Sequence, residues 1–555
     1  MQPHFTGNSL IIWIPAFAGM TQFCANGLFW MKRDFSSLCD RQFDLLVCGG
    51  GIYGAWTAYD AALRGLRVAI VEQGDWASAT SSASSKLIHG GLRYLETYDF
   101  KFVKKALRER QMLLKAAPHR VWPLRFGVPV YADSRIGTVQ LMAGLTLYDF
   151  LAGSLNSESS HHRYNAQAFA ERFPLLDPDN LQGGFTYADA QTDDARLVLE
   201  LIDGAMAAGA VCVNYCKLTD FLETSGKVLG ARVQNQLDGI TAEILAHQIV
   251  NATGQWTTAT QEGSGWCRLT KGIHLLLPAS LGGEALLLTA QSDGRVFFII
   301  PWYGLTLIGT TDTDYPGDIN HVAVEETDIA YLLAEANHYL KTAWTKADII
   351  GSYAGVRVMK HDDKSAPSSA SRDWELKTAS NGVHYSVGGK ITSAREDADH
   401  IVNLVCAQLS INTPCPTRGK KFPWTPDENY SVWLPAANAQ AKQLGVDEES
   451  AKWLIRRHGK RVGEIFRIIE RDTQMSERIL PALPFIHADL LWSARNEMVV
   501  HLDDLLRRRM PLLILARLTE DDLRRIAAFV AATLEWDEAA LNREIETCRL
   551  SWPHP

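Results

Sequence analysis

Residues 43–72 constrain the fold more than any other part of the chain. An apolar segment, residues 43–48, has the pattern of a buried parallel strand. Three glycines follow it at the spacing GxGxxG, namely Gly49, Gly51 and Gly54. A helical pattern, a second apolar segment and the acidic residue Glu72 complete the unit within about 30 residues. This order is typical of a dinucleotide-binding βαβ unit, so the sequence predicts such a site.

Each part of this unit has a physical role. The first glycine permits a tight turn, the second lets the backbone approach a pyrophosphate, and the third lets the helix pack against the strand. The start of the helix offers free N–H groups and the positive end of its dipole to the phosphates. The carboxylate of Glu72 can accept the ribose hydroxyls and would repel a 2′-phosphate. NADP is therefore disfavoured, whereas NAD and FAD both remain open at this point.

The bulk composition excludes several classes of protein. A chain of 555 residues is too long for one core and predicts two or three domains. The net charge of −8 gives no reason to expect a nucleic-acid partner. The nine cysteines show no metal-site spacing, and we predict no metal. No run of 18 apolar residues occurs, so no membrane-spanning helix is predicted.

Composition shifts divide the chain into four parts. Residues 1–42 form an N-terminal extension, and we expect translation to start at Met31. Residues 43–413 hold the nucleotide-binding and substrate-binding domains, interleaved in sequence. Four prolines in residues 414–426 indicate a linker, and residues 427–555 have almost entirely helical patterns.

Strand patterns recur through the middle of the chain. A strand at residues 244–250 leads into a second glycine turn that contains Thr253 and Gly254, at the strand end where α/β sheets place ligands. A strand–glycine–helix pattern that contains Gly389 follows later. Between them, three β-rich segments predict a separate antiparallel sheet: residues 272–278, 296–301 and 305–311.

Seven motifs together resemble one family. They are GGGIYGA, TSSASSKLIHGGLRYLE, NATGQW, KGIHLLLP, IIPWYGLTLIGTTDTDY, YAGVR and VGGKITSAR. Their order is similar to that of the FAD-dependent glycerol-3-phosphate dehydrogenases, densely over residues 43–400 and more loosely beyond. The resemblance implies an α/β protein with a Rossmann-like FAD-binding domain of the glutathione-reductase and D-amino-acid-oxidase type. It also implies an antiparallel substrate-binding sheet and a helical C-terminal domain.

The same resemblance implies an activity and a location. The family oxidises sn-glycerol 3-phosphate to dihydroxyacetone phosphate by hydride transfer to N5 of FAD. Electrons then pass to a membrane quinone, and the protein is cytoplasmic and peripheral on the inner face of the cytoplasmic membrane. No tether motif for covalent flavin occurs near the site, so we expect FAD to be bound non-covalently.

By the resemblance, the substrate is contacted by two catalytic residues, His274 and Arg357, and by Arg93, Tyr94, Lys390, Thr311 and Asp312. Three of these residues, Arg93, Arg357 and Lys390, are cations flanked by glycine or apolar residues, and such cations are suited to hold a phosphate dianion. A histidine between apolar neighbours can assist loss of the hydroxyl proton, although a core histidine is the alternative. For the Thr-Asp pair the alternative is an ordinary turn after a strand.

The resemblance also implies the cofactor contacts. Besides the three glycines and the acid of the βαβ unit, they are Ser84, Ser85, Lys86, His89, Gly90, Thr253, Gly254 and Gly389. Several positions depart from the family pattern, among them Met359 and the bulky Trp56. Val358 follows Arg357 where proline is usual, Gln255 also stands in place of a proline, Ala394 stands in place of a tyrosine, and Tyr53 is unusually bulky.

Two basic runs, residues 456–461 and 507–509, adjoin apolar residues and suggest a helix on anionic lipid. A solvated basic helix face is the alternative. The oligomeric state stays open, with a homodimer as one option.

Three other functions compete with the leading one. An oxidase would pass electrons from the same substrate to O₂ and yield peroxide. An amine oxidase of related fold would need a clamp for a carboxylate group. A non-catalytic flavin-binding protein would explain the positions that depart from the family pattern.

Overall fold

The computed structural model describes residues 31–39, 41–155, 157–260, 262–263, 265–279, 281–360 and 373–550. The prediction that residues 1–30 are an over-called extension lies outside the described residues. Within the described part of the chain, no helix is both long and apolar enough to cross a membrane.

The predicted βαβ unit is present as β1 (Phe43–Cys48), α1 (Ile52–Leu63) and β2 (Val68–Val71). It lies in an eight-stranded sheet whose main path runs β17-β18-β10-β1-β2-β7. The other strands are β7 (Val211–Val213), β8 (Cys216–Thr224), β9 (Lys227–Asn235), β10 (Thr241–Asn251), β17 (Glu375–Thr378) and β18 (His384–Val387). Five consecutive strands of this path, from β18 to β7, are parallel. The helix α1 packs against α5 (Asp194–Ala207) and α7 (Ala394–Gln408). The Rossmann-like fold class is therefore confirmed.

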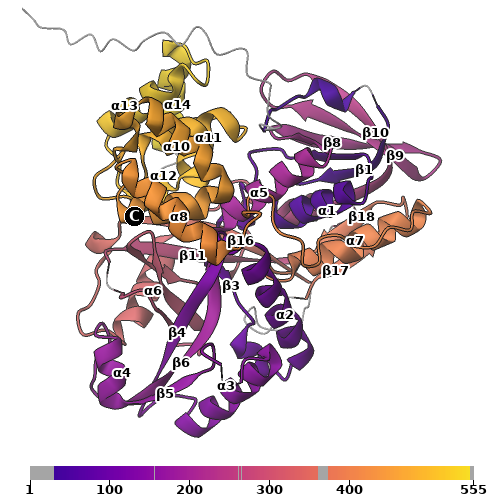
Figure 1. Ribbon diagram of the computed structural model, residues 1–555. Coiled ribbons are helices and arrows are strands. Elements are labelled where there is room, and N and C mark those ends of the chain that lie inside the picture. The colour runs from indigo at the N-terminus through magenta and orange to yellow at the C-terminus, as the bar shows by residue number, and fades with distance from the viewer. Residues whose placement is uncertain are drawn as a thin grey trace, which may run out of the picture. The chain divides into compact units, whose positions relative to one another are not determined.

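A second sheet of ten strands forms the predicted antiparallel layer (Figure 1), with one parallel pair between β12 and β4. Its path is β15-β11-β14-β13-β12-β4-β6-β3, with β16 beside β11 and β5 beside β6. The bounds are β3 (Leu87–Ile88), β4 (Val121–Tyr131), β5 (His162–Asn165), β6 (Leu181–Thr192), β11 (Cys267–Leu277), β12 (Ala285–Thr289), β13 (Val296–Trp302), β14 (Leu305–Gly309), β15 (Thr313–Asp314) and β16 (Gly351–Lys360). The strand β11 lies between β14 and β16, an arrangement that places three predicted site segments side by side.

Four helices accompany this sheet, and one short 3-10 turn, Leu92–Leu95, precedes the first of them. They are α2 (Phe100–Ala116), α3 (Thr138–Ala152), α4 (Ala166–Arg172) and α6 (Glu326–Asn337). The Asp99 carboxylate caps α2 by accepting the N–H of Phe102 at 3.1 Å, as expected of an Asp just before a helical pattern.

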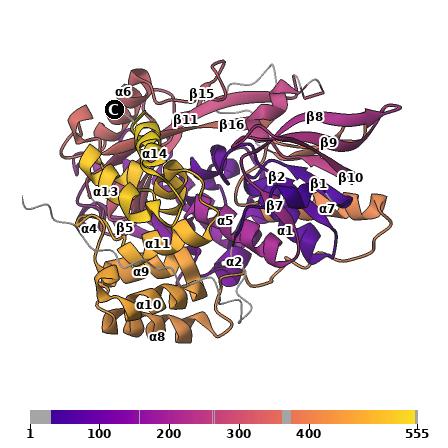
Figure 2. The ribbon, with the colours of Figure 1, turned by 90° about the horizontal axis from the view of Figure 1, so that it is seen from above.

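The C-terminal region is helical, as predicted, and its helices form one group in Figures 1 and 2. They are α8 (Tyr430–Gln443), α9 (Glu448–His458), α10 (Val462–Arg471), α11 (His487–Asn496), the π-helical turn Asp504–Arg509, α12 (Leu512–Leu515), α13 (Glu520–Ala531) and α14 (Glu538–Leu550). The proline-rich segment before them packs closely against the rest of the protein. Trp424 is buried, and the N–H of Phe422 donates to the carbonyl of Ala116 at 2.9 Å.

Buried ion pairs join these helices to the nucleotide-binding part of the chain. Arg509 and Arg508 both pair with Asp75, which lies three residues beyond Glu72. Arg196 of α5 pairs with Glu497 at 2.5 Å. Of these five side chains, four have no exposed surface and Arg508 is 5% exposed. Removing one partner of a buried ion pair leaves the other as an uncompensated charge, which strongly destabilises the folded protein. These ion pairs therefore hold the two regions together.

The prediction that the two basic runs face lipid is wrong. Arg457 is buried against Asp489, Arg508 and Arg509 are buried against Asp75, and the neighbouring Leu505 and Leu512 are fully buried. The physical reason is that each run supplies counterions for buried carboxylates. A sequence shows the arginines but does not show their partners.

Candidate active site

One cavity of about 880 Å³ extends from the glycine turn of the βαβ unit to the antiparallel sheet. Fifteen of the predicted site residues line it: Gly49, Gly51, Glu72, Ser84, Ser85, His89, Arg93, Tyr94, Thr253, Gly254, His274, Asp312, Arg357, Gly389 and Lys390. The structure thus brings together residues that lie more than 300 positions apart in sequence. The volume of the cavity falls in the range that is usual for cofactor and ligand sites.

The glycine turn has the close packing that the dinucleotide motif requires. A Cβ at Gly54 would stand 1.9 Å from the carbonyl oxygen of Gly49, so α1 could not approach β1 with any other residue there. Gly49 itself has φ +110°, a conformation that favours glycine. Ser81 accepts the N–H of Ile52 in the first turn of α1 at 2.9 Å. These contacts fix a turn whose backbone faces the cavity.

Glu72 lies at the tip of β2, as predicted. Its carboxylate accepts the N–H groups of Gly50 at 2.6 Å and Gly74 at 2.9 Å. Burial raises the pKa of this carboxyl, and the two N–H donors oppose that shift. The acid is therefore fixed next to the glycine turn, where a ribose would lie in a nucleotide complex.

The second glycine turn lies beside the first because β10 pairs in parallel with β1. The side-chain oxygen of Asn251 accepts both the N–H of Thr253 at 3.1 Å and its hydroxyl at 2.6 Å. Gly254 follows with φ +59°. Both strand ends therefore border the same cavity, which is the position expected for a ligand in this fold.

Together these features fit FAD. Three observations support this fit: the tight Gly49–Gly54 contact, the fixed Glu72 carboxylate and a cavity large enough for a dinucleotide. The residues that would hold the nucleotide come from the two glycine turns and from the Ser84–Ser85 segment.

His274 lies on β11 at the other end of the cavity. Its Nε2 is 2.8 Å from the hydroxyl of Ser85, and its ring stacks on Tyr353 with centroids 4.8 Å apart. Among the described residues, its Nδ1 has no hydrogen-bond partner. Burial lowers the pKa of the imidazole well below 6.5, and the charges of Arg357 and Lys86 lower it further. The ring is therefore neutral at pH 7 and can accept a proton.

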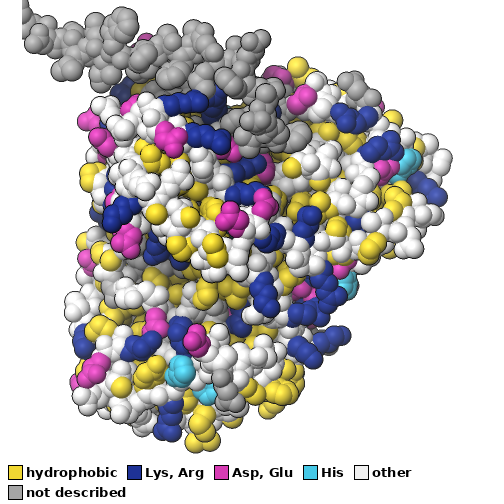
Figure 3. Space-filling model, viewed as in Figure 1, with side chains coloured by type: hydrophobic (Ala, Val, Ile, Leu, Met, Phe, Trp, Pro, Cys, Tyr) yellow, Lys and Arg dark blue, Asp and Glu magenta, His cyan; other side chains and the backbone are white. Residues whose placement is uncertain are grey.

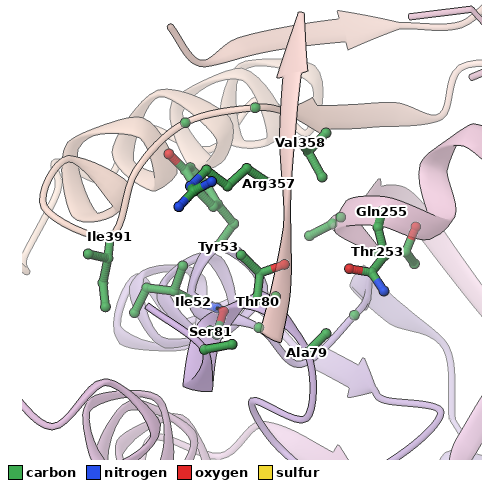
Figure 4. Close-up of a pocket in the computed structure, with 18 of the residues that line it drawn as sticks. Ile52, Tyr53, Ala79, Thr80, Ser81, Thr253, Gln255, Arg357, Val358 and Ile391 are labelled. Atoms are coloured by element: carbon green, nitrogen blue, oxygen red, sulfur yellow. Dashed lines mark hydrogen bonds between the residues drawn. The ribbon is translucent and has the colours of Figure 1, made fainter. Parts of the chain in front are cut away.

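Arg357 lies on β16, opposite Thr270 of the strand that carries His274. Its guanidinium donates to the Thr310 hydroxyl at 2.8 Å and to the Thr311 carbonyl at 3.1 Å, and it pairs with Asp312 at 3.2 Å. Figure 4 shows Arg357 and Val358 on opposite sides of the strand, as alternation along a strand requires. A Cβ at Gly272 would stand 2.2 Å from the guanidinium, so the glycine of the KGIH motif makes room for it.

Lys390 and Arg93 meet at one tyrosine. The Lys390 ammonium lies 3.8 Å from the centroid of the Tyr94 ring and 3.5 Å from that of Phe102. The Arg93 guanidinium donates to the Tyr94 hydroxyl at 3.0 Å. All three predicted cations line the same cavity, and two of them lie together at Tyr94.

The loop that carries Lys390 is fixed from α1 by Tyr53. The Tyr53 hydroxyl accepts the N–H of Lys390 at 2.9 Å and donates to Asp397 at 2.9 Å. A Cβ at Gly389 would stand 1.7 Å from that hydroxyl. The bulky residue noted in the sequence thus has a clear structural role, which is to hold the loop before α7.

Four predicted contacts lie behind the cavity lining formed by the described residues: Gly54, Lys86, Gly90 and Thr311. Lys86 is buried in an ion pair with Asp194 at 2.6 Å. The N–H of Gly90 donates to the Tyr148 hydroxyl at 3.0 Å, and the Thr311 hydroxyl accepts the N–H of Ile273 at 3.1 Å. In the described structure these residues support the lining from behind, and their direct contact with a ligand stays a prediction.

Sequence reasoning missed several supporting residues. Asp194 accepts from both Lys86 and Ser84, Tyr353 stacks on His274, and Ser81 lines the cavity. For Ser81 a signal existed, since it lies within the serine-rich motif that begins at Thr80. For Asp194 and Tyr353 no local signal existed, because their roles depend on pairing between distant segments.

Comparisons with known proteins show which families the chain matches. Residues 44–395 match the family described as FAD dependent oxidoreductase. Residues 428–541 match the C-terminal domain of alpha-glycerophosphate oxidase. The first match covers more than half of the chain, which confirms the cofactor as FAD.

Individual relatives are similar to this chain along most of its length. A glycerol-3-phosphate dehydrogenase of Synechocystis is 34% identical over 93% of this chain and 97% of its own. The aerobic glycerol-3-phosphate dehydrogenase of Bacillus subtilis is 33% identical over 93% of this chain and 96% of its own. The crystal structure of the Bacillus halodurans glycerol-3-phosphate dehydrogenase with FAD superposes with a TM-score of 0.76, at 30% identity, covering 93% of this chain and 95% of that one. The chain therefore belongs to the family of FAD-dependent glycerol-3-phosphate dehydrogenases.

Proposed function

We propose that this protein oxidises sn-glycerol 3-phosphate to dihydroxyacetone phosphate. The observation that carries the proposal is the set of three cations, Arg93, Arg357 and Lys390, that line the same cavity as His274. In this proposal residues 43–413 hold both cofactor and substrate, and residues 427–555 form the helical domain. The names of the relatives support the choice of substrate.

The cations suit a small phosphoester. Arg357 offers a planar fork already oriented by Thr310 and Asp312, and Lys390 offers a point charge held over two aromatic rings. A phosphate dianion is held best by such fixed, partly desolvated donors, because little side-chain entropy is lost on binding. An uncharged polyol would gain none of this attraction.

His274 is the proposed base for the substrate hydroxyl. The Ser85 hydroxyl and the Tyr353 ring hold the imidazole in one orientation, and its pKa keeps it neutral. When bound, FAD supplies the hydride acceptor at N5. A dianion bound at Arg357 would offset the charge that lowers the pKa of His274, so substrate binding would make this base stronger at the moment of use.

We further propose that the electrons pass to a membrane quinone and that the protein works on the inner face of the cytoplasmic membrane. Support comes from relatives that are named aerobic dehydrogenases. An oxidase of the same substrate differs only in using O₂.

A steady-state assay of the holoprotein tests the function. We expect a soluble quinone analogue to be reduced with glycerol 3-phosphate, with little activity on glycerol and a low yield of peroxide. Peroxide in equal amount to the product would instead assign the oxidase reaction. Activity on free glycerol equal to that on the phosphoester would contradict the role of the three cations.

A further inference from the structure

Both ring nitrogens of the proposed base, His274, are covered. The side chain lines the cavity, yet only 2% of its surface is exposed. Its Nδ1 atom is buried and has no hydrogen-bond partner among the described residues. The other nitrogen, Nε2, lies 2.8 Å from the hydroxyl of Ser85. A proton that leaves the cavity for this imidazole therefore arrives at Nε2, and it arrives through Ser85.

Ser85 is placed to pass on a proton. It lines the cavity and is partly exposed there. Within the described part of the chain, Nε2 of His274 is the one hydrogen-bond partner of its hydroxyl. A hydroxyl has one donor position and two acceptor positions, so it can donate to Nε2 and still accept from a second hydroxyl. The backbone of this segment stays available to contact the cofactor, as the resemblance implies.

The residues on either side of Ser85 are fixed by groups behind the cavity. Asp194 accepts the Ser84 hydroxyl at 2.7 Å and the Ser84 N–H at 3.1 Å, and it pairs with the Lys86 ammonium at 2.6 Å. The Tyr353 hydroxyl donates to the Ser84 carbonyl at 2.8 Å, and the Tyr353 ring stacks on the imidazole. One set of contacts thus holds both the serine segment and the base, so the distance between them is fixed before a substrate binds.

The charged groups around this pair leave the imidazole neutral. Unlike the Lys and Arg side chains that Figure 3 shows at the surface, Lys86 is buried and paired with Asp194. The second cation that affects the ring, Arg357, is paired with Asp312. Burial first, and then both of these positive charges, lower the pKa of His274. Since no carboxylate of the described residues pairs with the ring, it is able to take up a proton at pH 7.

We propose that Ser85 is a catalytic residue that relays the proton of the substrate hydroxyl to His274. The substrate O–H bond breaks as its proton forms a new bond to Oγ of Ser85. The proton that Ser85 carried passes to Nε2, and the ring becomes an imidazolium. The electron pair of the substrate C–H bond leaves as a hydride to the oxidised flavin, so the alcohol becomes a ketone. The inference rests on the proposed function and adds the path of the proton to it.

Anaerobic stopped-flow reduction of the bound flavin by saturating glycerol 3-phosphate tests the relay. The variants S85T and S85V have the same shape and differ only in the hydroxyl. We expect S85V to be slower than the wild type by about 10²–10³-fold, and S85T to stay within about tenfold of it. S85A removes the hydroxyl without adding volume and should be slowed like S85V. The matched control is S159A, at an exposed serine of the loop after α3, which should react like the wild type.

Two further readouts separate a relay from a serine that only orients the ring. Reduction of S85V should no longer slow at acid pH, because His274 no longer receives the proton, whereas S85T should keep this decline. In mixtures of H₂O and D₂O, the wild-type rate should depend quadratically on the deuterium fraction, since two O–H bonds break in one step. Orientation alone predicts a linear dependence and an acid decline in every variant.

The FAD content of each variant is measured by absorbance after unfolding, and we expect it to equal that of the wild type. A variant S85V that loses FAD but keeps the wild-type rate per bound flavin would assign Ser85 to the cofactor and overturn the relay. Equal rates in S85V and S85T, or a linear deuterium dependence in the wild type, would also overturn it. In these cases only the relay fails, because the wild type is still reduced. A wild-type holoprotein that glycerol 3-phosphate does not reduce contradicts the proposed function, and the relay with it.

Discussion

Gly309 lies directly opposite His274 on the neighbouring strand, and a Cβ there would stand 2.3 Å from Cδ2 of the imidazole. The two motifs KGIH and GLTLIG thus form one unit, in which the absence of a side chain leaves room for the ring. His274 is also fixed by Ser85 and by Tyr353. The position of the proposed base is therefore determined from three sides.

The variant G309A should displace the imidazole. We expect kcat to fall by about tenfold or more, because a shift of about 1 Å at a catalytic group costs that much. The KM for glycerol 3-phosphate should change less, since Arg93 and Lys390 lie on other segments and contact Tyr94. The matched control is G463A in α10, where a new Cβ meets nothing within 4 Å. Equal kcat in G309A and the wild type would show that the ring position does not matter.

The pH dependence of kcat/KM should report His274. Burial first, then the charges of Arg357 and Lys86, lower the pKa of this group below 6.5. Activity should therefore hold at neutral pH and decline only as the pH falls below 6.5, when the imidazole takes up a proton. In R357Q one of the lowering charges is gone, so the acid limb should move to higher pH, with an overall loss of about 10²–10³-fold. An acid limb at the same pH in both proteins would argue against His274 as the titrating group.

The variant Y53F should loosen the loop that carries Lys390. It leaves the Lys390 N–H without its acceptor and Asp397 without one donor, at a cost of about 1–3 kcal/mol. We expect the KM for glycerol 3-phosphate to rise several-fold with a smaller change in kcat. Y59F, at another buried tyrosine of α1, is the control. If both variants keep the wild-type KM, then Tyr53 does not position Lys390.

The buried ion network should make the protein sensitive to acid. Burial lowers the pKa of His458 to about 4, and Arg457 holds the pKa of Asp489 below its usual range although burial opposes this. The unfolded chain takes up a proton on this histidine near pH 6.5, whereas the folded protein does so only near pH 4. Stability present above pH 6.5 is therefore lost as the pH falls toward 4, by about 2 kcal/mol between pH 7 and pH 5.

Urea unfolding at pH 7 and pH 5 measures this dependence. We expect H458Q to show a smaller difference between the two pH values, even if it is less stable at both. H400Q, at an exposed histidine, should keep the wild-type difference. A wild-type protein equally stable at both pH values would contradict the assignment.

Local patterns in the sequence were enough to predict the cofactor half of the fold. Strand, glycine turn, helix and acid at Glu72 are contiguous, and each element is recognised from its own residues. The long strands β4 and β6 were not predicted. The first contains Pro123 and Pro129 and the second contains Gly183 and Gly184, residues that argue against strands when read locally. Their pairing with each other outweighs that local preference.

The site was predicted where a motif supplied the residue and not where a distant partner decided its role. His274, Arg357 and Lys390 border one cavity, as the resemblance implied. Lys86 looked like a cofactor contact, yet Asp194 holds it in a buried pair. The arginines of residues 507–509 looked like a lipid-facing surface, yet Asp75 pairs with two of them. In both cases the missing information was a carboxylate more than 100 positions away.

The central claim is that a flavin and a phosphoester share the cavity between Glu72 and Lys390. It is tested most directly by an anaerobic titration of purified holoprotein, followed by the visible absorbance of oxidised FAD. The account predicts that glycerol 3-phosphate abolishes this absorbance at near-stoichiometric amounts and that glycerol leaves it unchanged. An oxidised spectrum that persists with excess glycerol 3-phosphate would contradict the account.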